Sequence, residues 1–138
     1  MIRSRMCVLA ENVVRDADTN TTSIFGIVEE MRAQGFPLFV HKIAFFILWE
    51  RELTDPPRYE AQFSVTLNEQ TVHTLAINIE FREGTRLNRS IVNVNGLVLT
   101  QPGQLTFRVT IPETTEAVCA VPVIAPETTA ANLPVAPP

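Results

Sequence analysis

Hydrophobic and polar residues alternate along most of this chain, most clearly between residues 90 and 111. Before Gly96, valines alternate with asparagines; after Pro102-Gly103, apolar residues return at every second position through Ile111. A period of two places alternate side chains on opposite faces of a β-strand. Pro followed by Gly favours a type II turn, because Gly accepts a positive φ. The pattern therefore predicts two strands, each with one dry face, joined by a corner.

The same alternation, enriched in β-branched and aromatic residues, predicts six further strands. They span residues 6–14, 21–31, 39–51, 58–67, 71–81 and 117–124. The two strands at 58–67 and 71–81 are expected to form a hairpin. The last strand is expected at a sheet edge, because Pro122 cannot donate a ladder hydrogen bond. About seven to eight short strands without a helical segment indicate an all-β domain, namely an antiparallel, immunoglobulin-like β-sandwich.

We expect this sandwich to occupy residues 1–124. The remaining segment, 125–138, is rich in Pro, Thr and Ala and has no periodicity. Such a composition is typical of an extended tail that contributes no core. The sequence thus predicts one folded domain followed by a Pro-rich extended tail.

The strand at 39–51 is apolar on both faces. One face carries Ile43, Phe45, Ile47 and Trp49, and the other carries Ala44, Phe46 and Leu48. Since the sandwich core covers only one face, the second face needs a cover of its own. The loop 29–36, the tail or a second copy of the chain could supply it. In the last case Ala44, Phe46 and Leu48 form an oligomer interface, and Phe46→Glu should give a folded monomer.

Composition excludes some partners. The 138 residues carry a formal net charge of −4, with 15 acidic and 11 basic side chains. This mildly acidic balance gives no electrostatic reason to expect nucleic acid or an anionic membrane as partner. The longest apolar run, 43–49, is far shorter than the roughly 20 residues of a membrane-spanning helix. We expect no membrane association.

The location of the protein follows from its N-terminal segment and its cysteines. The apolar run at residues 7–10 is shorter than the core of about 7–15 residues in a signal peptide. We therefore expect a cytoplasmic protein. Cys7 and Cys119 lie on the first and last predicted strands, which could be neighbours, but a reducing compartment favours free thiols.

No motif for a catalytic, cofactor or metal site occurs in the sequence. The segment 16–20 matches the opening D-x-D-x-N of a calcium loop, but Thr21 and Ile27 replace the Gly and Glu that this loop needs. A solvated hairpin turn is the better interpretation. His41 and His73 are the only general-base candidates with a pKa near neutrality. Each lies on the same predicted strand face as neighbouring apolar residues, which favours partly buried structural histidines.

Two groups of residues are candidates for ligand binding. Arg82, Arg86 and Arg89 cluster before the strand at residue 90 and could hold an anion. Glu80 and Glu83 are interleaved with them, which favours a solvated loop with local ion pairs.

Trp49 and Tyr59 flank the loop around Pro56-Pro57 and could together form a platform for a carbohydrate ring. One Trp and one Tyr in the whole chain make a thin basis for a carbohydrate module. Packing in or near the core is therefore favoured for both rings.

Several structural motifs carry a family resemblance. Residues 24–28 (IFGIV), Phe36-Pro37 and 93–97 (NVNGL), followed by Pro102-Gly103, resemble a family of small bacterial proteins known only as a domain of unknown function. The resemblance covers about residues 7–124. It implies a compact cytoplasmic β-sandwich with no assigned activity, and it brings no catalytic residues.

Three functional hypotheses follow. The first is a non-catalytic structural or protein-interaction module without a cofactor, which forms a homo-oligomer through the strand at 39–49. The second is a sandwich that binds a small ligand, either an anion or a carbohydrate. The third is an enzyme with a site around His73, and it has the least support because no partner group is recognisable.

Overall fold

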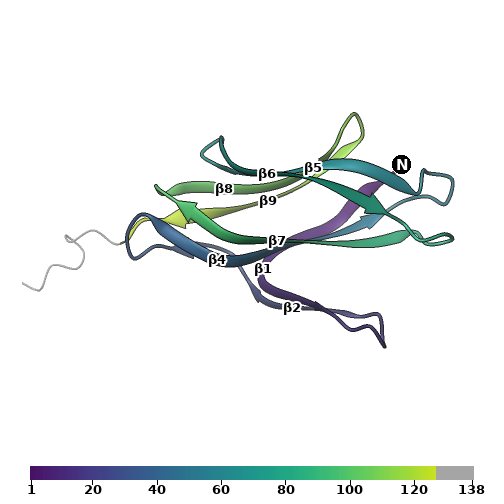
Figure 1. The fold of residues 1–138 in the computed structure, drawn as a ribbon, viewed down its shortest axis with the longest axis horizontal. Coiled ribbons are helices and arrows are strands. Elements are labelled where there is room, and N and C mark those ends of the chain that lie inside the picture. Colours follow the sequence, from purple (N-terminus) through teal and green to yellow (C-terminus); the bar gives the residue numbers. More distant parts are fainter. Residues whose placement is uncertain (127–138) are drawn as a thin grey trace, which may run out of the picture.

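The computed structural model describes residues 1–126, which form nine β-strands and no helix (Figure 1). The strands are β1 (Arg3–Arg15), β2 (Thr22–Ile27), β3 (Met31–Arg32), β4 (Leu38–Glu50), β5 (Arg58–Leu67), β6 (Gln70–Glu80), β7 (Leu87–Leu99), β8 (Gly103–Ile111) and β9 (Thr115–Ile124). The prediction of an all-β fold is confirmed. No helix within this part of the chain could span a membrane. The expected extended tail, 125–138, lies outside the described residues except for its first two.

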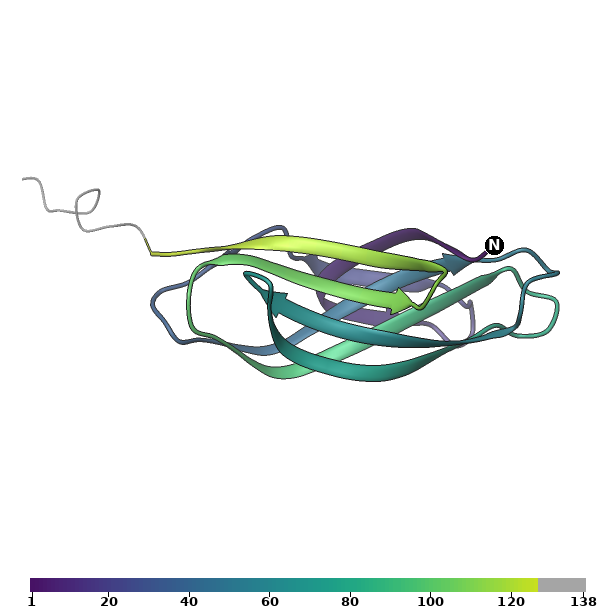
Figure 2. The same cartoon turned by 90° about the horizontal axis from the view of Figure 1, so that it is seen from above.

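The strands form two sheets that pack face to face (Figures 1 and 2). One sheet has the order β2-β1-β4-β7 and the other β3-β9-β8-β5-β6. All neighbours are antiparallel except β3 and β9. The hairpin expected at 58–67 and 71–81 is confirmed as β5–β6. The connections from β4 to β5, from β6 to β7 and from β7 to β8 cross between the sheets.

The strand expected at 21–31 is two strands in different sheets. The chain leaves β2 after Ile27 and crosses to the other sheet, where Met31 and Arg32 pair with the last two residues of β9. The expectation that β9 forms a sheet edge is therefore wrong at its end, where β3 covers Val123 and Ile124. A pattern of β-branched residues cannot show this crossing, because both pieces remain extended.

Aromatic side chains fill the space between the sheets. Phe45 of one sheet packs against Phe63 and Phe107 of the other, and the three ring centroids are 5.9 to 6.2 Å apart. Trp49 and Leu105 are fully buried beside them. Such packing of rings from facing sheets is the main contribution to the stability of a sandwich.

The inward face of β4 changes partway along the strand. Leu38 and Val40 contact the core, but from Ile43 onward the odd-numbered residues do so. The neighbouring strand β7 changes its face at the same level, where Gly96 has a φ of +74°. His41 lies at this change of face and is exposed, so the prediction that it is partly buried is wrong. His41 does not lie on the inward face with Ile43, as its odd number suggested, because the alternation is interrupted between the two residues.

The corner between β7 and β8 depends on Asn68. Gly103 has a φ of +145°, which differs from the value near +80° of a type II turn. The Asn68 side chain donates to the Pro102 carbonyl at 3.0 Å and accepts from the Gln104 N–H at 2.9 Å. A Cβ atom at Gly103 would lie 1.9 Å from Asn68 Oδ1. The corner therefore needs glycine because the Asn68 side chain passes so close to its backbone.

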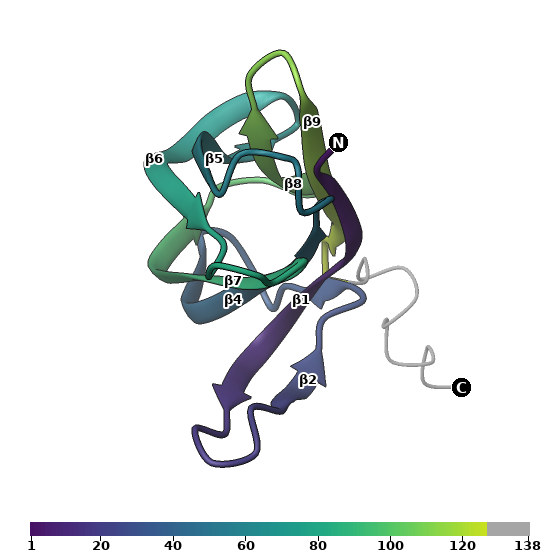
Figure 3. The ribbon, with the colours of Figure 1, turned by 90° about the vertical axis from the view of Figure 1, so that its right-hand side faces the viewer.

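The β1–β2 hairpin leaves the sandwich. β1 pairs with β4 from Arg3 to Ala10, whereas from Ala10 to Arg15 it pairs with β2. The hairpin projects from the side of its sheet that faces away from the five-stranded sheet (Figures 1 and 3). Beyond Ala10, β1 and β2 therefore pair with each other and not with β4.

Both faces of β4 are buried within the single chain from Ile43 to Ile47. On the outward face, Ala44 is 0% and Phe46 is 3% exposed, and Leu48 is half-buried. Ala44 and Phe46 are therefore not free on the surface, which corrects the expectation of an oligomer interface for these two residues. The loop 29–36 is not their cover, because its Met31 and Phe36 pack against the core between the sheets.

Candidate functional site

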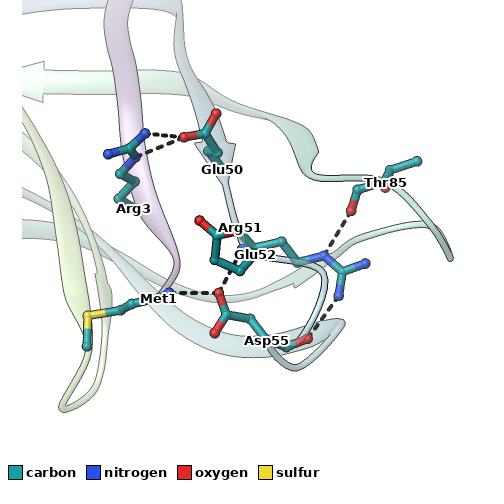
Figure 4. A network of polar contacts seen from close by, with 7 residues as sticks. All are labelled: Met1, Arg3, Glu50, Arg51, Glu52, Asp55 and Thr85. Carbon is teal, nitrogen blue, oxygen red and sulfur yellow. Dashed lines mark hydrogen bonds and ion pairs between the residues drawn. The ribbon is translucent and has the colours of Figure 1, made fainter.

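The most connected polar residues lie at one end of the sandwich and centre on Arg51 (Figure 4). Arg51 is only 4% exposed, and its guanidinium lies 4.9 Å from the centre of the Phe81 ring. It donates to the carbonyls of Thr85 at 2.9 Å, Asp55 at 3.0 Å and Arg82 at 3.4 Å. One buried side chain thus joins the β4–β5 and β6–β7 connections.

Two carboxylates complete this network. Asp55 lies 2.9 Å from the Met1 amine and accepts from the Glu52 N–H at 2.8 Å, and the bond to the amine is the main cause that lowers the pKa of Asp55. The hydrogen bond from Arg3 likewise lowers the pKa of Glu50. Both carboxylates are ionised and engaged, so the network stabilises this end of the fold rather than presenting a free acid or base. Arg51 was not identified from the sequence, because there it is only the polar residue at the end of an apolar strand.

The two histidines lie on different sheets and are both exposed. His41 of β4 packs edge-on against Phe39 at a centroid distance of 4.6 Å. His73 of β6 lies 6.1 Å from the Phe63 ring. The prediction that His73 is partly buried is wrong, because β6 is an edge strand and its first seven residues, 70–76, are all exposed. The structure therefore does not bring the two general-base candidates together.

The segment 16–20 forms the turn of the β1–β2 hairpin. Asp16 Oδ1 accepts hydrogen bonds from the N–H groups of Thr19 at 3.3 Å and Asp18 at 2.9 Å, and these bonds lower the pKa of Asp16. The carboxylate thus closes the turn, as the interpretation of a solvated turn requires. Within residues 1–126, no group of three His, Cys, Asp or Glu side chains is placed to hold a metal ion.

The aromatic pair considered for carbohydrate binding is not on one surface. Trp49 is fully buried between the sheets. Tyr59 is half-buried and packs edge-on against Phe81 at 6.4 Å. A stacking platform needs exposed ring faces, so these two residues cannot form one.

The two cysteines are free and lie on neighbouring strands of opposite sheets. The Cys7 thiol donates to the Val118 carbonyl at 3.3 Å, beside Cys119. Burial raises the pKa of both thiols, and the proximity of Cys119 raises the pKa of Cys7 further. Since the thiolate is the reactive form, both are poor nucleophiles near neutral pH.

Two of the three candidate arginines do come together. Arg82 and Arg89 line a groove of about 200 Å³ between the β6–β7 connection and the β1–β2 hairpin, and Arg15 from the end of β1 lines it with them. We call this the arginine groove. Arg86 does not line it; the Arg86 charge instead acts on Glu50, where it helps to lower the pKa of that carboxyl. Sequence reasoning missed Arg15, because only the projecting hairpin brings it near the other two.

The edge strand β2 presents the second candidate surface. Phe25 is 55% and Ile27 is 57% exposed, although both belong to an apolar strand. They pair in register with Asn12 and Ala10 of β1, and β2 has no strand on its other side within residues 1–126. We call Thr22–Ile27 with these two side chains the β2 edge.

Comparison with known proteins adds a family but no activity. A family model described as a family of unknown function (DUF6941) matches residues 5–124, which include all nine strands except the start of β1. No curated protein matches the sequence.

Proposed function

The chain belongs to this family of unknown function, and from the surface of its sandwich we propose that it is a non-catalytic protein-interaction module that associates with a second copy of itself through the β2 edge. The observation that carries the proposal is the exposure of Phe25 and Ile27 on a strand with one free side. An edge strand offers unpaired N–H and C=O groups to another chain. Exposed apolar side chains beside those groups add a hydrophobic contribution.

The composition of the β2 edge supports a second copy as the partner. Its six residues, TSIFGI, include no charged side chain. Proteins commonly protect exposed edges with charges or prolines, and β2 has neither. An uncharged strand is also compatible with itself in a two-fold symmetric pairing, in which each copy presents the same surface. Antiparallel pairing of two β2 strands would join the two four-stranded sheets.

In this proposal the strand at 39–49 contributes to the core and not to self-association. The sequence suggested self-association through Ala44, Phe46 and Leu48, but the single chain buries the first two. The association surface therefore moves from the outward face of β4 to β2, which is two strands away in the same sheet.

An immunoglobulin-like topology and a cytoplasmic location belong to the proposal as well. The strand order supports the topology, because β4 pairs with β7 in one sheet while β5 pairs with β8 in the other, as the crossed connections of an immunoglobulin-like sandwich require. Immunoglobulin-like sandwiches commonly serve as binding modules rather than enzymes, although fold alone does not determine function. The free thiols of Cys7 and Cys119 support a reducing compartment.

Sedimentation velocity at increasing protein concentration tests the self-association. We expect a concentration-dependent dimer in the wild type and a monomer in Phe25→Glu and Ile27→Glu. Phe39→Glu is the matched control, because Phe39 is a 51% exposed phenylalanine on β4, outside the β2 edge. A wild type that remains monomeric at about 100 μM, where even weak specific dimers form, would contradict the proposal. So would a loss of association in Phe39→Glu equal to that in Phe25→Glu.

A further inference from the structure

We propose that the arginine groove binds a small phosphate-bearing anion. The inference is independent of self-association, since the groove and the β2 edge are formed by different residues. The groove is lined by Arg15, Arg82 and Arg89 and continues into a wider recess of about 510 Å³ around Arg15, Asn20 and Arg82. Two stretches that are far apart in the sequence, 15–20 and 80–89, contribute to it.

The backbone beneath these arginines is held in place. The Arg82 carbonyl accepts from Thr85 Oγ1 at 2.7 Å and from the Thr85 N–H at 3.0 Å, as well as from buried Arg51. Arg89 lies within β7, opposite Leu48 of β4. The backbone of Arg82 is thus held by hydrogen bonds and that of Arg89 by strand pairing, which reduces the backbone entropy lost on binding.

The third guanidinium is positioned by its own hairpin. Arg15 donates to Asn20 Oδ1 at 2.7 Å. This bond leaves the remaining donors of the Arg15 guanidinium available, because a guanidinium carries five. Asn20 has a φ of +57°, and Asp16 closes the same turn, so the position of the Asn20 amide is set by the turn.

Charge in the groove is unbalanced. Glu80 is the carboxylate among its lining residues, and its side chain lies 3.4 Å from Arg58 on the neighbouring strand. Within residues 1–126, neither Arg82 nor Arg89 has a carboxylate within 4.0 Å. Guanidinium groups that share a groove repel one another, and a bound anion offsets that repulsion.

The donors in the groove favour a phosphate over other anions. Guanidinium groups bind tetrahedral oxyanions through paired N–H···O bonds, and three of them suit a group with several charged oxygens. The Asn88 amide is already engaged, since its Nδ2 donates to the Glu80 carbonyl at 2.7 Å. The volume of about 200 Å³ and the net charge of −4 favour a small ligand over an extended polyanion such as nucleic acid.

Isothermal titration with pyrophosphate, inorganic phosphate and sulfate tests this inference. The titrations use roughly 20 mM salt, where surface charges are weakly screened. We expect pyrophosphate to bind more tightly than phosphate, and phosphate more tightly than sulfate. Arg82→Gln and Arg89→Gln should each weaken pyrophosphate binding about tenfold, as expected for one lost charge-assisted hydrogen bond.

Arg86→Gln is the matched control, because it removes the same charge from outside the groove. We expect it to lose clearly less affinity than Arg82→Gln, because Arg86 does not line the groove and acts on the ligand only through its charge. Arg82→Lys keeps the positive charge but loses the paired N–H donors of the guanidinium, so it should still weaken pyrophosphate binding. Circular dichroism confirms that each variant is folded.

Three results would overturn the inference. The first is no heat and no thermal stabilisation at about 10 mM pyrophosphate, a concentration at which even a weak site is occupied. The second is equal binding of sulfate and pyrophosphate. The third is an equal loss of affinity in Arg86→Gln and Arg82→Gln, which would mean that only the overall charge matters.

Discussion

Strands β4 and β2 both carry phenylalanine on the face that points away from the gap between the sheets, but the two side chains differ in exposure. Phe46 is 3% exposed, whereas Phe25 is 55% exposed. Phe46 lies between Val8 of β1 and Ile91 of β7, at the centre of its sheet. Phe25 has a neighbouring strand on one side only, where it faces Asn12. The number of neighbouring strands at each residue, and not the composition of the strand, distinguishes the two phenylalanines; Phe39 of β4, which lies beyond the β1 pairing, is 51% exposed as well.

The consequence is a division of roles between the two strands. Buried aromatic rings on β4 contribute to folding, because their apolar area is removed from water. The Phe25 ring on β2 is 55% exposed, and no other part of residues 1–126 covers that area, so a second molecule could bury it. The following substitutions test this division, beginning with the largest expected effect.

Phe46→Glu and Phe25→Glu test the comparison directly. Phe46→Glu places a carboxylate in a site that excludes water, so we expect a loss of about 4 kcal/mol or more in the free energy of unfolding. Phe25→Glu should change that free energy by no more than about 0.5 kcal/mol, as is usual for an exposed site. Urea denaturation followed by circular dichroism, at a protein concentration low enough to keep the chain monomeric, measures both.

A well-folded Phe46→Glu monomer would contradict the observed burial. It would instead agree with the expectation from the sequence that Phe46 lies in an interface. The two variants therefore separate a core position from a surface position with the same substitution.

Arg51 and Arg86 offer the same contrast for a charged residue. Arg51→Met removes two short hydrogen bonds from a buried guanidinium and leaves the carbonyls of Thr85 and Asp55 without their donor. We expect a loss of about 3 kcal/mol, in line with charge-assisted bonds to buried acceptors. Arg86→Met, at an exposed arginine of the β6–β7 connection, should cost less than about 0.5 kcal/mol, because it keeps the backbone bond to Arg51.

Urea midpoints of the two arginine variants measure this difference. Similar midpoints for both would show that the Arg51 network contributes little to stability. In that case the two crossover connections would be held by their backbone bonds alone.

Acid should weaken the same end of the sandwich, with a smaller effect. Glu50 and Asp55 have pKa values lowered below the ordinary 4.5 and 3.8, chiefly by hydrogen bonds from Arg3 and from the Met1 amine. A lowered pKa in the folded state stabilises the fold above the ordinary value, and this stabilisation is lost as the pH falls through the folded-state value. We therefore expect the urea midpoint to fall progressively below about pH 4.5.

The double variant Glu50→Gln, Asp55→Asn is the control for this pH dependence. It should begin with a lower midpoint at pH 7 and decline less between pH 5 and pH 3, because the two titrating groups are gone. An unchanged slope would assign the acid sensitivity to other carboxylates.

The alternation of apolar and polar residues was sufficient to predict most of the strands. The strand at 58–67 has the expected bounds, and β8 shows the expected alternation, with Leu105 and Phe107 fully buried. Local alternation determines these strands, because each has one face against the core along its whole length. The turn at 16–20 was also predictable, since Asp closes such turns through its own side chain.

The same reasoning failed where a strand changes its face or its neighbours. His41 is exposed because β4 changes the face it turns to the core, and the strand expected at 21–31 divides because the chain crosses between sheets. Arg15 joins the arginine groove only because the hairpin projects from the sheet. The interruption at Gly96 marks the change of face in the sequence, but which strands become neighbours depends on contacts that no window of sequence contains.

The sequence by itself determined that this protein is an all-β molecule, because alternation with a period of two is a property of neighbouring residues. Only the tertiary structure decided that Phe46 is buried while Phe25 is exposed, and that Arg15 lies with Arg82 and Arg89 while Arg86 does not. Burial and the meeting of charged groups depend on which strands become neighbours. That choice is made by contacts between residues distant in the chain, which the local pattern does not record.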